Sequence, residues 1–284
     1  MEVSKLKKNS TEAVPLIENF CIWLQEQKKS VNTIKTYKRE LEIYQEWLQE
    51  NGRGLDLLKK VDIQSYIYYL ESQKKSITTI DKTAGVIRTF AKYLGKPELT
   101  FGLDIKPVEK NNDIETLSTK EYNELLGKVK EDDNLRNTTI VYVLLHTGIR
   151  ISELCSLNRS HIDLESHELT VDKNEDTRVI PLSNEAREYL SLYLNSHSYQ
   201  AIFVSNHTGE RLSERAVQYM LKKYNVTPQV LRHTFCQRLI DTKVDVETVA
   251  RLAGHKDINV TKKYIKAQMN NQKVEDAIND AFKK

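Results

Sequence analysis

The sequence predicts a mainly α-helical protein with an N-terminal helical bundle and a mostly helical second domain that contains a small antiparallel β-sheet. Apolar residues recur at steps of three and four through most of the first hundred residues, as in amphipathic helices. A stretch rich in Pro, Gly and polar residues interrupts this pattern. In the second half, two short segments flank a polar turn, which is typical of a β-hairpin. We therefore expect a helical domain over 1–100, a linker over 101–114 and a second domain over 115–284.

The N-terminal domain should contain about four helices. The first covers residues 15–27, the second runs from its cap to Asn51-Gly52, and the others cover 62–73 and 77–94. Ser30 or Asn32 can cap the second helix. One face of that helix is marked by Ile34, Tyr37, Leu41, Tyr44 and Leu48. No internal repeat is apparent in the chain.

The second domain should begin on a helix, because Ser118 and Glu121 form a capping box. A strongly apolar helix over 135–147 follows. Strands are expected over 168–172 and 178–182. Further helices should start near residues 185, 214, 229, 246, 259 and 274.

Composition excludes several classes of protein. The three cysteines, Cys21, Cys155 and Cys236, are far apart and form no CxxC pair, so neither a disulfide framework nor a thiolate zinc site is expected. No apolar stretch is long enough for a signal peptide or a membrane span. A soluble cytoplasmic protein without a membrane partner is expected. The net charge of +3 favours an anionic partner only mildly, and the positive charge is concentrated in the first hundred residues.

Several segments of the second domain each contain a residue suited to binding a phosphodiester. They are TGIRISEL at 147–154, Lys173 followed by RVIPL at 178–182, LRHTF at 231–235, and LAGH at 252–255 with Tyr264 nine positions later. In this order they resemble the motifs of the tyrosine recombinases, also called the phage integrase family. The resemblance implies a SAM-like core-binding domain followed by a catalytic domain. Several motifs in the right order make a chance match implausible.

Physical chemistry gives the matching residues their roles. Attack on a phosphodiester concentrates negative charge on the non-bridging oxygens, which the planar guanidinium groups of Arg150 and Arg232 can bind. Lys173 can protonate the leaving 5′-oxygen. The resemblance implies that Tyr264 forms a 3′-phosphotyrosyl ester and that His255 binds the phosphate. Neither a metal nor another cofactor is required.

Gln229 is the one departure, because the family usually has histidine three residues before its second arginine. Glutamine can donate a hydrogen bond to phosphate but cannot exchange a proton near pH 7. His233 is adjacent to Arg232, but on a helix it points about 100° away, so a structural role is expected.

Each catalytic residue also has an ordinary interpretation. Arg150 could pair with Glu153, which would then brace the helix, and Arg232 could pair with Asp241 or solvent. A helical tyrosine such as Tyr264 is usually a packing residue. A lysine on a hairpin turn is normally just solvated.

Double-stranded DNA is the expected partner. Cations interleaved with hydroxyl side chains suit phosphate contacts, and the N-terminal candidates are Lys35, Lys38, Arg39, Lys74, Lys75, Lys82 and Arg88. The alternative is a solvated helix face balanced by Glu40, Glu42 and Glu46. In the family, the two domains close around the duplex.

The resemblance implies recombination by four protomers on two DNA sites through a Holliday junction, and it allows for accessory DNA sites or proteins. It extends to simple recombinases such as the Xer proteins and transposon-encoded cointegrate resolvases of the TnpI kind, and Gln229 favours a mobile-element resolvase or integrase. The amphipathic segment 270–284 should dock on a neighbouring protomer. The alternatives are a DNA-binding protein that has lost cleavage and a type IB topoisomerase-like enzyme.

Overall fold

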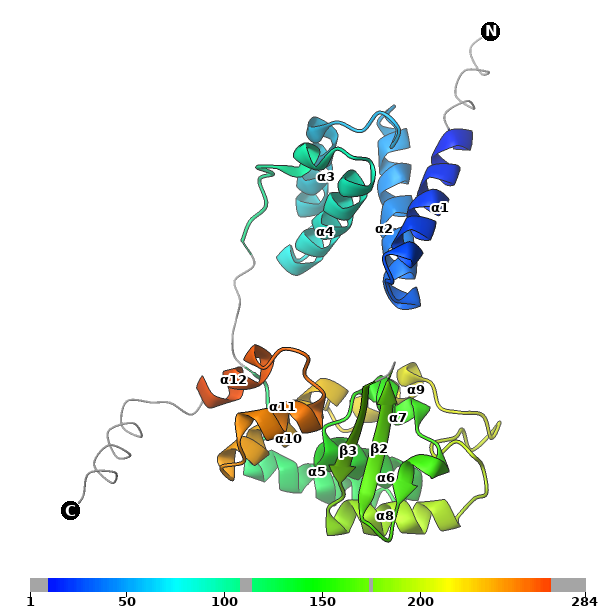
Figure 1. The fold of residues 1–284 in the computed structure, drawn as a ribbon, viewed down its shortest axis with the longest axis vertical. Coiled ribbons are helices and arrows are strands. Elements are labelled where there is room, and N and C mark those ends of the chain that lie inside the picture. The colour runs from blue at the N-terminus through cyan, green and yellow to red at the C-terminus, as the bar shows by residue number, and fades with distance from the viewer. Residues whose placement is uncertain (1–9, 108–113, 174–175, 267–284) are drawn as a thin grey trace, which may run out of the picture. The chain divides into compact units, whose positions relative to one another are not determined.

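The structure, a computed structural model, describes residues 10–107, 114–173 and 176–266. The chain divides into two compact units, Met1–Asn111 and Asn112–Lys284, which are described separately (Figure 1). The mainly helical class with one small antiparallel sheet is confirmed. Within the described ranges, no helix is long and apolar enough to cross a membrane.

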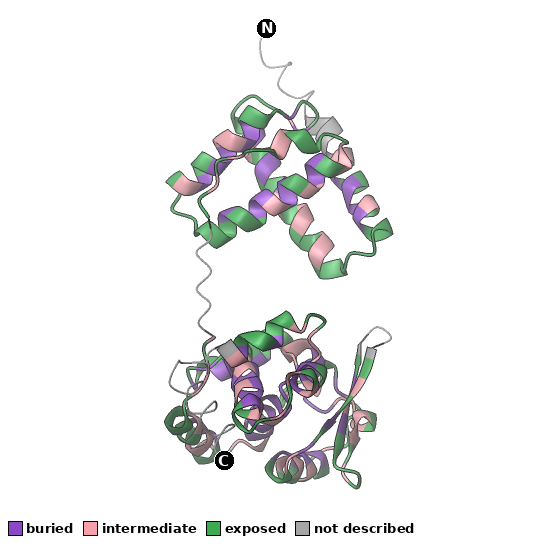
Figure 2. Ribbon diagram, turned by 60° about the vertical axis from the view of Figure 1, so that its left-hand side comes forward, coloured by how far each residue is buried: buried purple, intermediate pink, exposed green. Residues whose placement is uncertain are grey.

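The N-terminal unit is a helical bundle whose apolar faces meet in one core. Its elements are α1 (Ser10–Glu26), α2 (Val31–Glu50), α3 (Lys60–Ser72), α4 (Ile77–Tyr93) and the short 3₁₀ helix η1 (Pro97–Thr100). Figure 2 shows the buried stripes of these helices alternating with exposed faces. Ser30, and not Asn32, caps α2 by accepting from the backbone N–H of Thr33. The four expected helices are confirmed.

Two turns of this unit repeat each other, contrary to the expectation of no internal repeat. Residues 27–34 (QKKSVNTI) join α1 to α2, and residues 73–80 (QKKSITTI) join α3 to α4. Lys28 and Lys74 both adopt φ of 55°. In each turn the serine hydroxyl accepts from the backbone N–H three residues later, at 3.2 Å. The repeat is eight residues long, which is too short to stand out against the helical periodicity.

The second unit is mostly helical. Its elements are α5 (Thr119–Glu131), α6 (Leu135–Thr147), α7 (Ile151–Ser156), η2 (Arg159–His161), β1 (Ile162–Asp163), β2 (Glu168–Lys173), β3 (Asp176–Pro181), α8 (Asn184–Asn195), α9 (Glu214–Lys222), α10 (Pro228–Asp241), α11 (Val246–Ala253) and α12 (Asn259–Lys266). The strands form one antiparallel sheet in the order β1-β2-β3. The two predicted strands are confirmed, and β1 is an addition. The helix expected from residue 274 lies outside the described residues.

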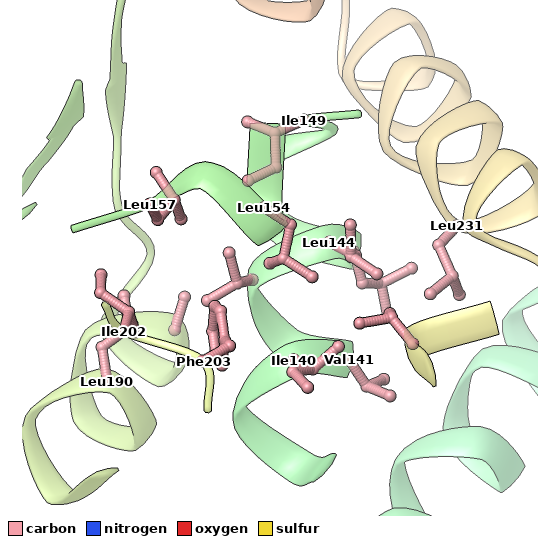
Figure 3. Packing of buried hydrophobic residues seen from close by; sticks show 14 of the residues in the cluster. Ile140, Val141, Leu144, Ile149, Leu154, Leu157, Leu190, Ile202, Phe203 and Leu231 are labelled. Atoms are coloured by element: carbon pink, nitrogen blue, oxygen red, sulfur yellow. The ribbon is translucent and has the colours of Figure 1, made fainter. Parts of the chain in front are cut away.

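Helix α6 is the centre of the second core. Most of its side chains are buried, and Figure 3 shows Ile140, Val141 and Leu144 among residues from neighbouring elements, including Phe203 and Leu231. Fully surrounded helices are apolar on all faces, which explains the nearly continuous apolar run in the sequence. The end of α6 is therefore held rigidly, and Arg150 follows it by three residues.

Two glycines end helices next to the candidate site. Gly148 ends α6 with φ of 62°, and a Cβ there would lie 2.2 Å from Cδ1 of Phe235. Gly254 ends α11 with φ of 65°, and a Cβ there would lie 2.9 Å from the guanidinium carbon of Arg178. Both positions require glycine for conformation and for space.

We predict that Gly148→Ala destabilises the protein by about 2–4 kcal/mol, because it adds left-handed strain and an overpacked contact with Phe235. Urea unfolding measures the change. Gly127→Ala is the matched control, since Gly127 lies within α5 with no atom within 4 Å of the added Cβ. It should stabilise the helix by about 0.5–1 kcal/mol. Equal stability of the two variants would contradict the tight packing at Gly148.

Candidate active site

Arg150 is fixed at the start of α7 by three hydrogen bonds. Its backbone N–H donates to Oε2 of Glu153 at 2.7 Å, and its Nη1 donates to Oε1 of the same carboxylate at 3.2 Å. Its Nη2 donates to the carbonyl oxygen of Gly254 at 2.7 Å. The side chain is 36% exposed, so the guanidinium is both oriented and open to a ligand. The ordinary pairing with Glu153 and the catalytic interpretation are therefore compatible.

Glu153 is a buried anion that binds both Arg150 and Arg178. It therefore braces the site, as expected from the sequence. It is 3% exposed and accepts from Arg178 at 3.1 Å and 2.7 Å in addition to Arg150. Burial acts to raise the pKa of Glu153, but the hydrogen bonds from Arg178 and from the backbone of Arg150 hold it below its ordinary value. Arg178 also donates from Nε to the carbonyl of Leu252 at 2.9 Å. The carboxylate thus joins α7, β3 and the end of α11.

Arg178 is the functional residue that the sequence prediction missed. The motif places it on a strand, and its side chain is only 10% exposed in the ion pair with Glu153. An acidic residue inside an arginine motif was the available signal, since a buried carboxylate needs cationic partners.

Arg232 provides a buried cation with an unused donor. It lies on α10, is 4% exposed, and donates from Nη1 to the carbonyl of Gly148 at 2.5 Å. Its Nη2 is buried and has no hydrogen-bond partner among the described residues. Burial and then the neighbouring charge of Arg150 lower the pKa of Arg232 to about 10, so it stays charged at neutral pH. Buried donors are normally paired, so this one is suited to an incoming anion.

His255 is held next to the arginines as a neutral imidazole. Its Nδ1 lies 2.8 Å from Oγ1 of Thr261, which is fully buried. Burial and the charges of Arg232 and Arg150 lower the pKa of His255 to about 4. If the threonine hydroxyl donates to Nδ1, then Nε2 carries the proton and can donate to a phosphate.

Gln229 and His233 contact each other on α10. Gln229 is exposed one turn before Arg232, and its Nε2 lies 2.6 Å from Nε2 of His233. Burial lowers the pKa of His233, with the charge of Arg232 acting in the same direction. His233 was expected to be structural, and its contact with Gln229 was not anticipated from the sequence.

Tyr264 is covered by its own domain. It lies on α12, is 1% exposed, and packs in a cluster with Cys236 and Phe235. The ring of His233 meets it edge to face, with centroids 5.9 Å apart. Burial raises the pKa of Tyr264 strongly, its hydrogen bond with Cys236 adds to this, and the charge of Arg232 opposes it. The hydroxyl is therefore protonated and shielded in this state.

The remaining predicted residues are not part of the cluster around Arg150 and Arg232. Lys173 ends β2 and pairs with Asp176 across the hairpin, but its side chain lies outside the description, so its role as an acid stays a prediction. In the N-terminal unit, Lys38 forms an ion pair with Glu18, and Arg88 lies 3.7 Å from Asp81. The other five cations are exposed without an ion pair in the described ranges: Lys35, Arg39, Lys74, Lys75 and Lys82. Within those ranges, no three His, Cys, Asp or Glu residues are placed to hold a metal.

The chain is similar to known proteins over both of its units. The phage integrase family matches residues 115–271, and its N-terminal SAM-like domain matches residues 17–96. A tyrosine recombinase XerD from Oceanobacillus iheyensis is 30% identical over 274 residues, covering 87% of this chain and 92% of that protein. A XerC recombinase from Staphylococcus aureus is 28% identical, covering 84% and 87%.

Two solved structures show the same fold. The Tn1549 transposon integrase in complex with transposon right end DNA has a TM-score of 0.74 and 18% identity, covering 94% of this chain and 99% of that one. The XerH recombinase bound to a palindromic difH substrate has a TM-score of 0.68 and 18% identity, covering 93% and 83%. With more than half of its length matched, the chain belongs to the phage integrase family, the tyrosine recombinases that cleave and rejoin DNA.

Proposed function

We propose that this protein is a site-specific recombinase that cuts one strand of its DNA site through Tyr264 and rejoins it to a partner strand. The observation that carries this proposal is the buried guanidinium of Arg232. Its Nη2 has no hydrogen-bond partner among the described residues. Its charged or titratable neighbours include Arg150, His255 and Tyr264. A buried cation with a free donor is costly unless it binds an anion.

The proposed reaction assigns one step to each of these groups. Arg150 and Arg232 bind the non-bridging oxygens of the scissile phosphate, and the neutral His255 donates a further hydrogen bond. Tyr264 loses its proton to water, its oxygen attacks phosphorus, and the bond to the 5′-oxygen breaks. Lys173 gives a proton to that oxygen. A 5′-hydroxyl of the partner strand then attacks the phosphotyrosyl ester and releases Tyr264. Because the ester preserves the bond energy, rejoining needs no ATP.

The substrate must open the site. The Tyr264 hydroxyl and the Arg232 donor are both covered in this structure. We therefore infer that α12 shifts when DNA binds, exposing the hydroxyl beside the arginines. Phosphate binding compensates the buried charge of Arg232. The Tyr264 hydroxyl then leaves its contact with Cys236 and lies beside the arginines and the phosphate.

We further propose a homotetramer on two double-stranded sites, acting in the cytoplasm on DNA of a mobile element, as a cointegrate resolvase or an integrase. The similarity to a transposon integrase and the presence of Gln229 support this choice. Accessory DNA sites or proteins are part of the same proposal. The protomer contact through residues 270–284 stays a prediction.

Replacing the nucleophile tests the reaction class. With nicked suicide duplexes taken from the DNA that flanks the gene, wild type should form a covalent protein–DNA adduct on a denaturing gel. Tyr264→Phe should form none and leave the footprint intact, since it removes only the attacking oxygen. Tyr219→Phe is the matched control, because Tyr219 is 80% exposed on α9. A wild-type footprint without an adduct would indicate the DNA-binding protein, and relaxation of supercoiled DNA lacking a specific site would indicate the topoisomerase.

The side chain at position 229 can be tested by pH. Gln229→His introduces an imidazole with an ordinary pKa of about 6.5. Its neutral form can accept the Tyr264 proton, so the ratio of variant to wild-type cleavage rates should rise from about pH 5.5 to about pH 8. Gln237→His, two turns later on α10, should give a constant ratio. A constant ratio for both variants would mean that position 229 exchanges no proton.

The repeated turns offer a test of DNA contacts. We include Lys28 and Lys29 with the predicted cations, because they repeat the conformation of Lys74 and Lys75. Replacing Lys74 and Lys75 by alanine should weaken binding and lower the slope of log affinity against log salt by about two, as measured by titration at several salt concentrations. Lys38→Ala should lower it less, since Lys38 is paired with Glu18. Equal slopes for the double variant and wild type would remove this face from the interface.

A further inference from the structure

We propose that His233 is a positioning residue that holds the amide of Gln229 as a donor for the scissile phosphate and at the same time packs against the Tyr264 ring. The proposal rests on the recombinase function and assigns a role to the one position where the chain departs from its family. His233 lies in the LRHTF motif at 231–235. The proposed role does not require His233 to contact the phosphate or the leaving oxygen.

The first support is the contact between two nitrogens. Nε2 of Gln229 lies 2.6 Å from Nε2 of His233, one turn apart on α10. An amide nitrogen only donates, so in this arrangement the imidazole Nε2 accepts and the ring proton is on Nδ1. Nδ1 of His233 is buried without a hydrogen-bond partner among the described residues, while the backbone of Glu115 acts to raise the pKa of the ring. The amide of Gln229 then retains a second N–H for an anionic oxygen.

The second support is the difference in burial between the partners. Gln229 is exposed, and an unrestrained glutamine loses side-chain entropy when it is fixed. His233 is half-buried between α10 and the start of the second unit, so its ring is already fixed. A fixed acceptor restricts the side-chain conformations of the exposed amide that donates to it. Gln229 therefore reaches the phosphate-binding state at a lower entropic cost.

The third support is the contact of His233 with the nucleophile. The His233 ring meets Tyr264 edge to face at 5.9 Å and 69°. One side chain thus contacts both the exposed donor and the covered hydroxyl-bearing ring, and its neighbour Arg232 holds the free guanidinium nitrogen. Movement of Tyr264 out of its cluster changes the packing of the residue that orients Gln229.

Burial and the charge of Arg232 favour the neutral imidazole of His233. Its titratable neighbours are Arg232, His255, Glu115 and the protonated Tyr264. Burial and Arg232 lower the pKa of His233, whereas Glu115 acts in the opposite direction. Nε2 is therefore an acceptor at neutral pH. Protonation in acid would turn it into a donor and break the contact with the Gln229 amide nitrogen.

A double-mutant cycle tests the coupling, with single-turnover cleavage of the suicide duplex as the rate and a footprint titration as the affinity. Gln229→Ala and His233→Ala should each slow cleavage by about tenfold to a hundredfold. The double variant should be no more than about threefold slower than the slower single variant, because both remove the same interaction. DNA affinity should stay within about threefold throughout, since the arginines and the N-terminal unit supply most phosphate contacts.

Rescue and a control distinguish positioning from packing. His233→Gln places an amide oxygen near the position of Nε2 and should restore cleavage to within about threefold of wild type. Gln237→Ala is the matched control, because Gln237 makes another contact one turn along α10, to Asp241 at 3.0 Å, and should leave the rate unchanged. The ratio of wild-type to Gln229→Ala rates should shrink in acid as His233 protonates, at a pH below the ordinary histidine pKa of about 6.5, because burial lowers the pKa of His233.

Two results would overturn the proposal: multiplicative losses in the double variant, or a His233→Ala protein that cleaves like wild type. A lower melting temperature would show that His233→Ala unfolds. In that case the pH dependence of the ratio of wild-type to Gln229→Ala rates, together with the cleavage rate of His233→Gln, decides the question. Failure of the wild type to form any adduct would instead overturn the recombinase function, so the two failures are distinguishable.

Discussion

The Glu153 carboxylate is the buried charge on which the geometry of the site depends. Two arginines from α7 and β3 converge on it, and each of them also binds a backbone carbonyl of the turn that ends α11. Removing one partner from such a cluster leaves an uncompensated buried charge, at a cost of about 3–5 kcal/mol. Three segments far apart in the sequence are thereby held in one arrangement before any DNA is present.

This arrangement explains why two helices must end in glycine. The carbonyl of Gly148 accepts from Arg232, and the carbonyl of Gly254 accepts from Arg150. Left-handed turns direct these carbonyls at the arginines, and a side chain at either glycine would collide with Phe235 or Arg178. Backbone conformation, and not only side-chain identity, therefore positions both guanidinium groups.

Most of the helices and the two predicted strands could be inferred from periodicity and capping residues, as with Ser118 and the apolar run of α6. The residues of the site could be named because their motifs are local. Three features could not be inferred. The bidentate contact of Arg178 with Glu153 joins residues 25 positions apart. The capping of α2 depends on whether the side chain of Ser30 or of Asn32 faces the helix. The burial of Tyr264 depends on how α12 packs on α10. Periodicity encodes which face of a helix is buried but not what covers it.

The burial of Tyr264 and the unpartnered Nη2 donor of Arg232 have one physical consequence in common. Desolvation raises the pKa of the tyrosine, and the same desolvation leaves a charged donor unpaired. Both penalties fall when a phosphate enters, because the anion pairs with Arg232 and its neighbours can stabilise a tyrosinate that has left its apolar cluster. If Tyr264 is the nucleophile, as we propose, a hydroxyl held in this way is inert toward water and small electrophiles until a phosphodiester binds the arginines. Because His233 contacts both the Tyr264 ring and the Gln229 amide, the release of the tyrosine and the ordering of the phosphate donor can occur as one step and not as two independent events.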